Sequence, residues 1–190
     1  LNLPDKPKGR DRASAFSPLD ISDLLREPIE ETPWVVPGYL ARGTLTLLAG
    51  PPKSGKSTLA YHLIKSIANG ENFLGCAITK GKVLLLGLEE HRRDITTRLR
   101  YLGSEELNGK VKVEFGPLPF TERVLKEMVS HIKAEEIDVV VVDTVHVWWG
   151  LDDENSAGEV LRIGGILLNT VRQTQAAWLC LAHTRKSGGE

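Results

Sequence analysis

One short segment constrains the fold of this chain more than any other. Residues 50–57 read Gly-Pro-Pro-Lys-Ser-Gly-Lys-Ser, with an apolar run (Leu45–Ala49) before them and a helical pattern (Lys56–Ala68) after them. A glycine-rich turn that leads into a helix N-terminus presents backbone N–H groups and a positive dipole end to an anion. The segment therefore predicts a strand, a phosphate-binding loop and a helix in succession.

Two side chains of this loop predict its ligands. Lys56 has the position of a lysine that reaches the β- and γ-phosphates of a nucleotide, and the Ser57 hydroxyl has the position of a magnesium ligand. We therefore expect ATP and Mg²⁺ to bind here, although Lys53 also fits a solvated loop residue. The residues expected to contact the nucleotide are Gly50, Pro51, Pro52, Lys53, Ser54, Gly55, Lys56, Ser57 and Thr58.

The rest of the pattern indicates an α/β fold. Strongly apolar runs alternate with segments of helical period, which is typical of a mainly parallel sheet flanked by helices. Ser156 and Glu159 form a capping box that predicts a helix running to Thr174. The predicted strands are 44–49, 83–88, 111–115, 137–142 and 177–182.

Composition limits the class of protein. The chain has 190 residues, 41% hydrophobic and 26% charged, which suits one globular domain, here expected at 34–190 behind a partly irregular arm at 1–33. The formal charge of -1 gives no overall attraction to nucleic acid. Two cysteines and the lack of a long apolar stretch favour a cytoplasmic protein with no membrane partner. The chain starts at Leu1 and ends in Ser-Gly-Gly-Glu, so we expect the domain to be incomplete at its C-terminal end.

Three acidic residues follow predicted buried strands. Asp143 ends the run Val139–Val142 and is the expected metal carboxylate, with an ordinary core-strand Asp as the alternative. Thr144 follows it, so the general base must come from elsewhere. Glu89 follows the strand at 83–88 and is the expected base, with Glu90 as the substitute. The remaining alternative is that both glutamates are solvated.

His183 follows the last predicted strand. A polar residue at that position could contact the γ-phosphate and transmit its loss to the next loop. The alternative is a hydrogen-bonded histidine at a strand end. We expect Lys56, Glu89 and His183 to be the catalytic residues, and Ser57 and Asp143 to be the metal ligands.

The combined pattern resembles the RecA-like P-loop ATPases, and among them the RepA-type hexameric replicative helicases. The resemblance extends from Trp34 to Gly188. It is carried by the loop at 50–58, Glu89, Asp143 without an adjacent Glu, the acidic run at 152–156 and the run Ala182–Gly188. It implies a RecA-like core, and it implies for Lys56, Ser57, Asp143, Glu89 and His183 the roles given above.

The resemblance also implies a homo-oligomeric ring, such as a hexamer, with nucleotide between subunits. The loops after Asp143 and His183 would then face single-stranded DNA, through Trp148 and Trp149 in one and Arg185 and Lys186 in the other. The tryptophans could instead pack against a neighbour or the N-terminal arm. The family's arginine finger lies beyond the position of His183, and the sequence shows no separate DNA-recognition module. The basic run at 91–93 with Arg98 and Arg100 fits a solvated helix face.

Three functions remain open at this point. The first is an ATP-driven motor that acts on single-stranded DNA in replication or recombination. The second is an ATP-dependent switch or assembly protein that translocates nothing, which the lack of a strong basic patch favours. The third is a small-molecule kinase, for which the sequence offers no Arg-rich lid.

Overall fold

The computed structural model describes residues 17–103, 107–150 and 157–184. Contacts divide the chain into two units, Leu1–Thr32 and Pro33–Glu190. In the first unit the described residues form one short helix, α1 (Ile21–Leu24), whose N-cap Asp20 accepts a hydrogen bond from the Ser22 backbone N–H (2.8 Å). Every described side chain of that unit is exposed, so α1 belongs to no hydrophobic core.

The second unit is built on a five-stranded parallel sheet, as the sequence predicts. The strand order is β3-β7-β6-β4-β5, so the strand before the phosphate-binding loop lies at one edge. The observed bounds lie close to the predicted ones. They are β3 (Leu45–Gly50), β4 (Val83–Gly87), β5 (Val111–Phe115), β6 (Val139–Asp143) and β7 (Ala177–His183).

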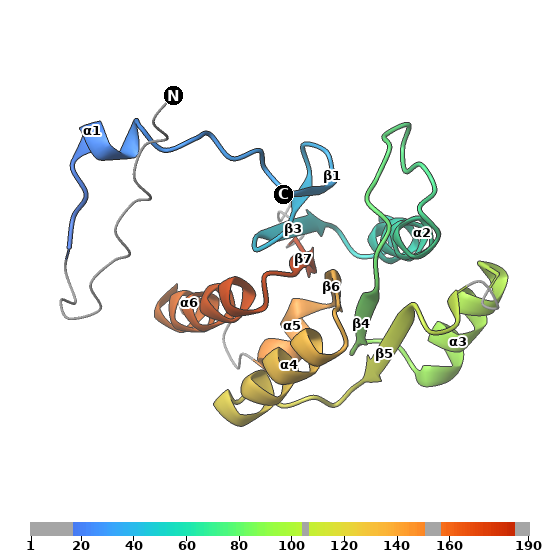
Figure 1. Cartoon of the computed structure of the whole chain (residues 1–190). Coiled ribbons are helices and arrows are strands. Elements are labelled where there is room, and N and C mark those ends of the chain that lie inside the picture. Colours follow the sequence, from blue (N-terminus) through green and yellow to red (C-terminus); the bar gives the residue numbers. More distant parts are fainter. Residues whose placement is uncertain (1–16, 104–106, 151–156, 185–190) are drawn as a thin grey trace, which may run out of the picture. The chain divides into compact units, whose positions relative to one another are not determined.

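Helices cover both faces of this sheet (Figure 1). One face carries α2 (Lys56–Asn69) and α3 (Arg92–Tyr101), and the other carries α4 (Glu122–Ala134), α5 (Val145–Trp149) and α6 (Ala157–Thr174). Side chains of a strand alternate between the faces. Val139 and Val141 of β6 therefore join the core on the α2 face, and Val140 and Val142 join the core on the α4 face.

The helical pattern after the phosphate-binding loop predicts an apolar stripe of Leu59, Leu63, Ile64 and Ile67, and most of this stripe is confirmed. Leu63, Ile64 and Ile67 of α2 are buried against the sheet, but Leu59 is 36% exposed and does not belong to that core. Helix α6 ends at Thr174 as expected, whereas Ser156, half of the predicted capping box, lies outside the described residues. Among the helices that the structure describes, none is long and apolar enough to cross a bilayer.

A small hairpin precedes β3 and is missing from the sequence prediction. Strands β1 (Trp34–Val36) and β2 (Leu40–Ala41) pair antiparallel, and Val35, Val36 and Leu40 are buried in the core on the α2 face. The hairpin also accepts a hydrogen bond from the loop after α2, from the Thr79 backbone N–H to the Val35 carbonyl (3.0 Å). The signal that could have found it is Val35-Val36-Pro37-Gly38, an apolar pair followed by a turn dipeptide.

Candidate active site

The register of the sheet brings the predicted site residues together at the carboxyl ends of the strands. Gly50 of β3 lies opposite His183 of β7, and Gly87 of β4 lies opposite Asp143 of β6. The backbone N–H groups of Leu88 and Glu89 then bond to the Asp143 carbonyl (2.8 and 3.3 Å). The carboxyl ends of these strands therefore form one platform, which is where ligands bind in open α/β sheets.

The phosphate-binding loop joins this platform to α2. Gly55 is the N-cap of α2 with φ 89°, in the left-handed region that a side chain disfavours, which explains a glycine at this position. Residues 51–55 are exposed and carry no side-chain cap on the helix N-terminus, so the first N–H groups of α2 are available to an anion. Lys53 is exposed with φ 62° and has no described contact to another site residue.

Lys56 is held within its own loop. Its side chain is buried, and its ammonium donates to the carbonyls of Gly50 (3.0 Å) and Pro51 (2.9 Å). A third contact joins Lys56 Nζ to His183 Nδ1 at 3.2 Å. An ammonium has three N–H donors, so all three have an acceptor in this conformation. A phosphate that takes Lys56 must displace at least one of them.

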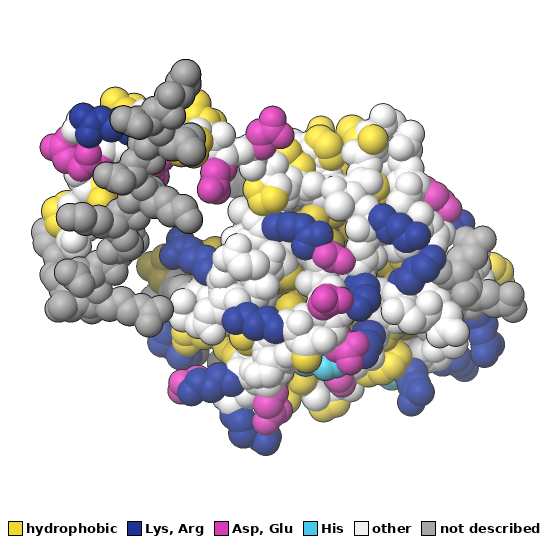
Figure 2. Space-filling view, viewed as in Figure 1, with side chains coloured by type: hydrophobic (Ala, Val, Ile, Leu, Met, Phe, Trp, Pro, Cys, Tyr) yellow, Lys and Arg dark blue, Asp and Glu magenta, His cyan; other side chains and the backbone are white. Residues whose placement is uncertain are grey.

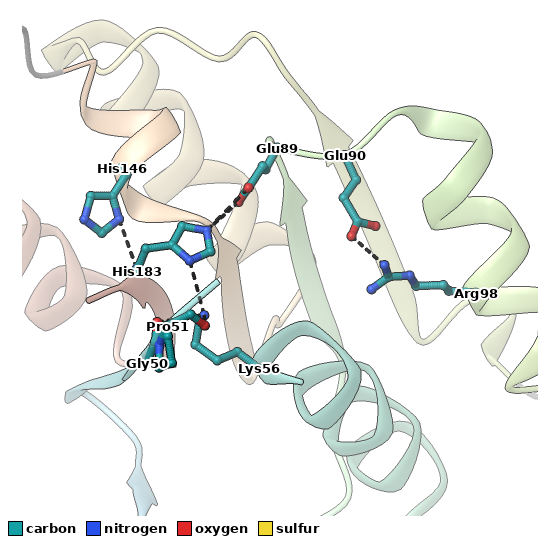
Figure 3. Close-up of polar contacts among 8 residues, drawn as sticks. All are labelled: Gly50, Pro51, Lys56, Glu89, Glu90, Arg98, His146 and His183. Atoms are coloured by element: carbon teal, nitrogen blue, oxygen red, sulfur yellow. Dashed lines mark hydrogen bonds and ion pairs between the residues drawn. The ribbon is translucent and has the colours of Figure 1, made fainter. Parts of the chain in front are cut away.

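His183 connects Lys56 to Glu89 (Figure 3). Its Nε2 lies 3.3 Å from Glu89 Oε2 and 3.4 Å from Oε1. An ammonium only donates and a carboxylate only accepts, so a neutral imidazole with its proton on Nε2 satisfies both contacts. The three residues predicted to be catalytic therefore lie in one chain of polar contacts, although their separation along the sequence is large.

Glu90 points away from this chain (Figure 3). Its carboxylate forms an ion pair with Arg98 of α3 (2.7 Å), and the Arg98 guanidinium lies 5.6 Å from the centre of the Tyr61 ring. Burial raises the pKa of Glu90, while Arg98 acts to lower it. The structure thus places Glu89 toward the phosphate-binding loop and Glu90 toward α3. The sequence had not identified Arg98 as a partner of Glu90.

Asp143 and Ser57 offer the oxygen ligands that magnesium prefers. Asp143 is 3% exposed, and burial raises the pKa of its carboxyl, opposed by a hydrogen bond from Ser57. Mg²⁺ keeps several waters and takes only one or two protein oxygens beside substrate phosphates. Among the described residues no group of three or more His, Cys, Asp or Glu side chains is arranged to hold a metal ion.

His146 is a further residue at this edge that sequence reasoning missed. Its Nδ1 accepts a hydrogen bond from the His183 backbone N–H (3.4 Å), and the two rings are 6.0 Å apart. The bond fixes the strand end from which the His183 side chain projects. A polar residue three positions after Asp143, just past a buried strand, was the available signal.

The structure corrects the expectation that Trp148 lies in a DNA-facing loop. Residues 145–149 form α5, and Trp148 is 2% exposed between Phe120 (ring centres 5.0 Å apart) and Trp178 (6.3 Å). A side chain so enclosed cannot stack on a base. Trp149 is half-buried against the same core. Arg185 and Lys186 lie outside the described residues.

Comparison with protein families agrees with this architecture. Residues 10–189 match the model of a family described as an AAA domain, which is nearly the whole chain. The curated relatives of this chain include the DNA repair protein RadA of Chlamydia pneumoniae, which is 24% identical over 93% of this chain and 36% of that protein. RadA of Aquifex aeolicus is 29% identical over 66% of this chain and 24% of that protein. The chain thus spans about a third or less of the length of these relatives.

A solved structure supports the fold. A KaiC-like protein from Pyrococcus horikoshii superimposes with a TM-score of 0.57 at 20% identity, over 83% of this chain and 72% of that chain. These matches do not single out the RepA-type helicases, so that part of the resemblance stays a prediction. The matched family, the parallel sheet and the phosphate-binding loop at its edge agree with one another: the chain belongs to this AAA domain family and is a RecA-like P-loop ATPase.

Proposed function

We propose that this chain is the ATP-hydrolysing domain of a RecA-type motor that acts on single-stranded DNA in repair, replication or recombination. The observation that carries the proposal is the contact chain Lys56–His183–Glu89, beside the buried Asp143, at one edge of the sheet. The DNA part is supported by the name of the RadA relatives, and the hydrolytic part by the site itself.

Each residue has a chemical task in this proposal. Lys56 leaves its loop carbonyls for the β- and γ-phosphates, where its charge stabilises the transferred phosphoryl group. Glu89 orients a water and accepts its proton, which a carboxylate on a strand end beside the loop can do. Ser57 and Asp143 would hold Mg²⁺, which supplies charge neutralisation at the phosphates.

His183 is the residue that transmits the state of the site. In the described conformation its ring is shared between Lys56 and Glu89. When Lys56 turns to phosphate, the Nδ1 contact is given up and His183 is free to reorient toward the γ-phosphate. Because His183 begins the segment that leads to Arg185 and Lys186, this change would be passed to residues proposed to contact DNA. A ring of identical subunits would complete each nucleotide site, as the resemblance implies.

The hydrolytic role is tested with two glutamates that are adjacent in sequence. Glu89→Gln should lower the ATP turnover of the full chain about 10²–10⁴-fold, because it removes the proton acceptor. Glu90→Gln is the matched control and should retain turnover, since Glu90 is paired with Arg98. Phosphate release is measured for both, with Lys56→Ala as the binding-deficient reference. If Glu90→Gln loses turnover and Glu89→Gln does not, the assignment of the base is wrong.

The DNA role needs a separate test. Single-stranded DNA should stimulate phosphate release, and it should bind to the protein in a filter assay at low salt, with affinity that falls as salt rises. Double-stranded DNA and a polyanion such as heparin serve as controls for charge alone. An oligomer that hydrolyses ATP but binds no single-stranded DNA would rule out the motor and leave the ATPase assignment intact.

A second candidate is an ATP-dependent switch or assembly protein without translocation. Two observations favour it. Trp148, one of the proposed DNA contacts, is buried, and Lys and Arg side chains on the face shown in Figure 2 are interspersed with Asp and Glu rather than gathered in one basic patch. Nucleotide-dependent assembly in sedimentation experiments, without any response to DNA, would select this function over the motor.

A further inference from the structure

A cavity opens beside the phosphate-binding loop and along the helix that follows it. Its volume is ≈ 820 Å³, and it begins at Gly55, Lys56 and Thr58, which belong to the loop and the start of α2. From there it extends along α2 to His62 and reaches Phe73 and Leu74 in the loop after that helix. Among its described lining residues there is no Glu89, Asp143 or His183.

The position of this cavity suits the base end of a bound nucleotide. In a nucleoside triphosphate the γ-phosphate and the base are at opposite ends of the molecule. In the proposed site Glu89, His183 and Asp143 mark the γ-phosphate end. Lys56 contacts His183 and also lines the cavity. A nucleoside that extends from the loop away from these three residues would enter this cavity. A volume of this size also lies within the ~300–1,000 Å³ typical of small-molecule sites.

The far wall of the cavity is a tight turn with an unusual conformation. Phe73 and Cys76 exchange two backbone hydrogen bonds (2.9 Å each), and Leu74 and Gly75 between them have φ 49° and 81°. A leucine in the left-handed region costs free energy, and such strain is concentrated at functional sites. The Leu74 side chain is nevertheless 75% exposed, so burial in the core does not explain why a leucine is held there.

The turn is fastened to the rest of the domain. The Thr79 backbone N–H and hydroxyl donate to the carbonyls of Val35 and Trp34 (3.0 Å each), and the Gly81 N–H donates to the Ile67 carbonyl (3.0 Å). Phe73 also packs against the core on the α2 face. The apolar wall is thus placed before any ligand arrives, and a preformed wall reduces the entropy lost on binding.

We propose that His62, Phe73 and Leu74 form the subsite for the purine base of the nucleoside triphosphate held by the phosphate-binding loop. The inference rests on the proposed nucleotide-binding role of Lys56. The Phe73 ring and the Leu74 side chain offer apolar surface to the face of the base, and the exposed His62 imidazole offers a polar group at its edge. Leu59, which is not part of the α2 core stripe, completes the apolar lining.

Calorimetric titrations of the full chain with MgATP and with inorganic tripolyphosphate separate the base from the phosphates. Phe73→Leu keeps an apolar side chain but removes the ring, and Leu74→Gly removes an exposed side chain at a φ that glycine tolerates. Phe73→Leu should weaken MgATP binding about tenfold, the order expected for one lost stacking contact. Leu74→Gly should also weaken it, because apolar contact with the base is lost. Both variants should leave tripolyphosphate binding unchanged. Lys56→Ala should weaken both ligands. Tyr101→Leu, at an 88% exposed aromatic residue of α3, is the control.

The outcomes distinguish the subsite from the loop. If the protein binds tripolyphosphate as tightly as MgATP, or if both turn variants keep the MgATP affinity, the subsite is refuted and the phosphate-binding role of Lys56 stands. If neither ligand binds, the nucleotide-binding role fails, and the subsite fails with it. Should Phe73→Leu lower the melting temperature through its core contact, Leu74→Gly alone decides.

Discussion

Asp143, the expected metal ligand, is a single residue whose ionised carboxylate lowers the stability of the folded protein. Its carboxyl is almost fully enclosed at the end of β6, and burial raises its pKa. A raised pKa means that ionisation costs free energy in the folded protein, because the same carboxyl is solvated in the unfolded chain. A core strand gains nothing from such a group, whereas a magnesium ligand must be ionised when nucleotide binds.

We expect Asp143→Asn to stabilise the nucleotide-free protein at neutral pH. Between the unfolded pKa of about 3.9 and the higher folded pKa, the folded state binds more protons, so stability falls as pH rises through that window and stays lower above it. Asparagine removes this loss. A gain of about 1 kcal/mol would raise the melting temperature by about 2–4 °C.

Thermal unfolding at pH 7 and at pH 3 checks the sign. The gain should be present at pH 7 and should vanish at pH 3, where Asp143 is protonated in both states. An Asp143→Asn variant that is less stable at pH 7 would show that hydrogen bonds to the carboxylate, including the one from Ser57, outweigh its burial.

The sequence favoured Glu89 over Glu90 as the base, but it gave no contact that distinguishes the two side chains. Both follow the same strand, and local pattern does not say which one turns toward the loop. The difference depends on Arg98 of α3, which pairs with Glu90, and on His183 at the end of β7, which contacts Glu89. By contrast, the strand, loop and helix around residues 50–57 were predictable, because their signal is contained in one short segment.

Among the elements, the strands were predictable and α5 was not. Runs such as Val139–Val142 are apolar throughout. This pattern is typical of a strand whose two faces are both covered by helices. Trp148 and Trp149 come shortly after Asp143, and the sequence pattern there predicts a loop. Its burial is decided by Phe120 and Trp178, two residues of other elements, and no local period reports such contacts.

Helix α5 therefore belongs to the core, and substitutions in it should act on stability. Trp148→Ala should lower the free energy of unfolding by about 3–5 kcal/mol, because it leaves a large cavity between Phe120 and Trp178. Val147→Ala, at a 48% exposed neighbour on the same helix, should change it by no more than about 0.5 kcal/mol. Urea titration measures both. A Trp148→Ala protein with unchanged stability and impaired DNA binding would restore the DNA-contact interpretation.

At the scale of the whole molecule, the strand order creates the site. Because β7 lies between β3 and β6, His183 is placed next to Gly50 and within reach of both Lys56 and Glu89. Strand order depends on how the crossover helices divide between the two faces, and hydrophobic pattern alone leaves it open. Lys56 therefore contacts its own loop and a residue more than a hundred positions later in the chain, so a phosphate that takes its ammonium would alter contacts at the ends of both β3 and β7.

Nucleotide should consequently stabilise the fold as a unit. A ligand that binds only the folded state at 100 times its Kd adds about 2.7 kcal/mol, which corresponds to a rise in melting temperature of about 5–10 °C. We expect this rise with MgATP and a smaller one when EDTA removes Mg²⁺, since Ser57 and Asp143 then lose their shared ligand. Lys56→Ala should abolish the rise, because it removes the ammonium. In the proposed site that ammonium leaves the Gly50 and Pro51 carbonyls and donates to the phosphates. A rise that survives in Lys56→Ala would place nucleotide binding away from this loop.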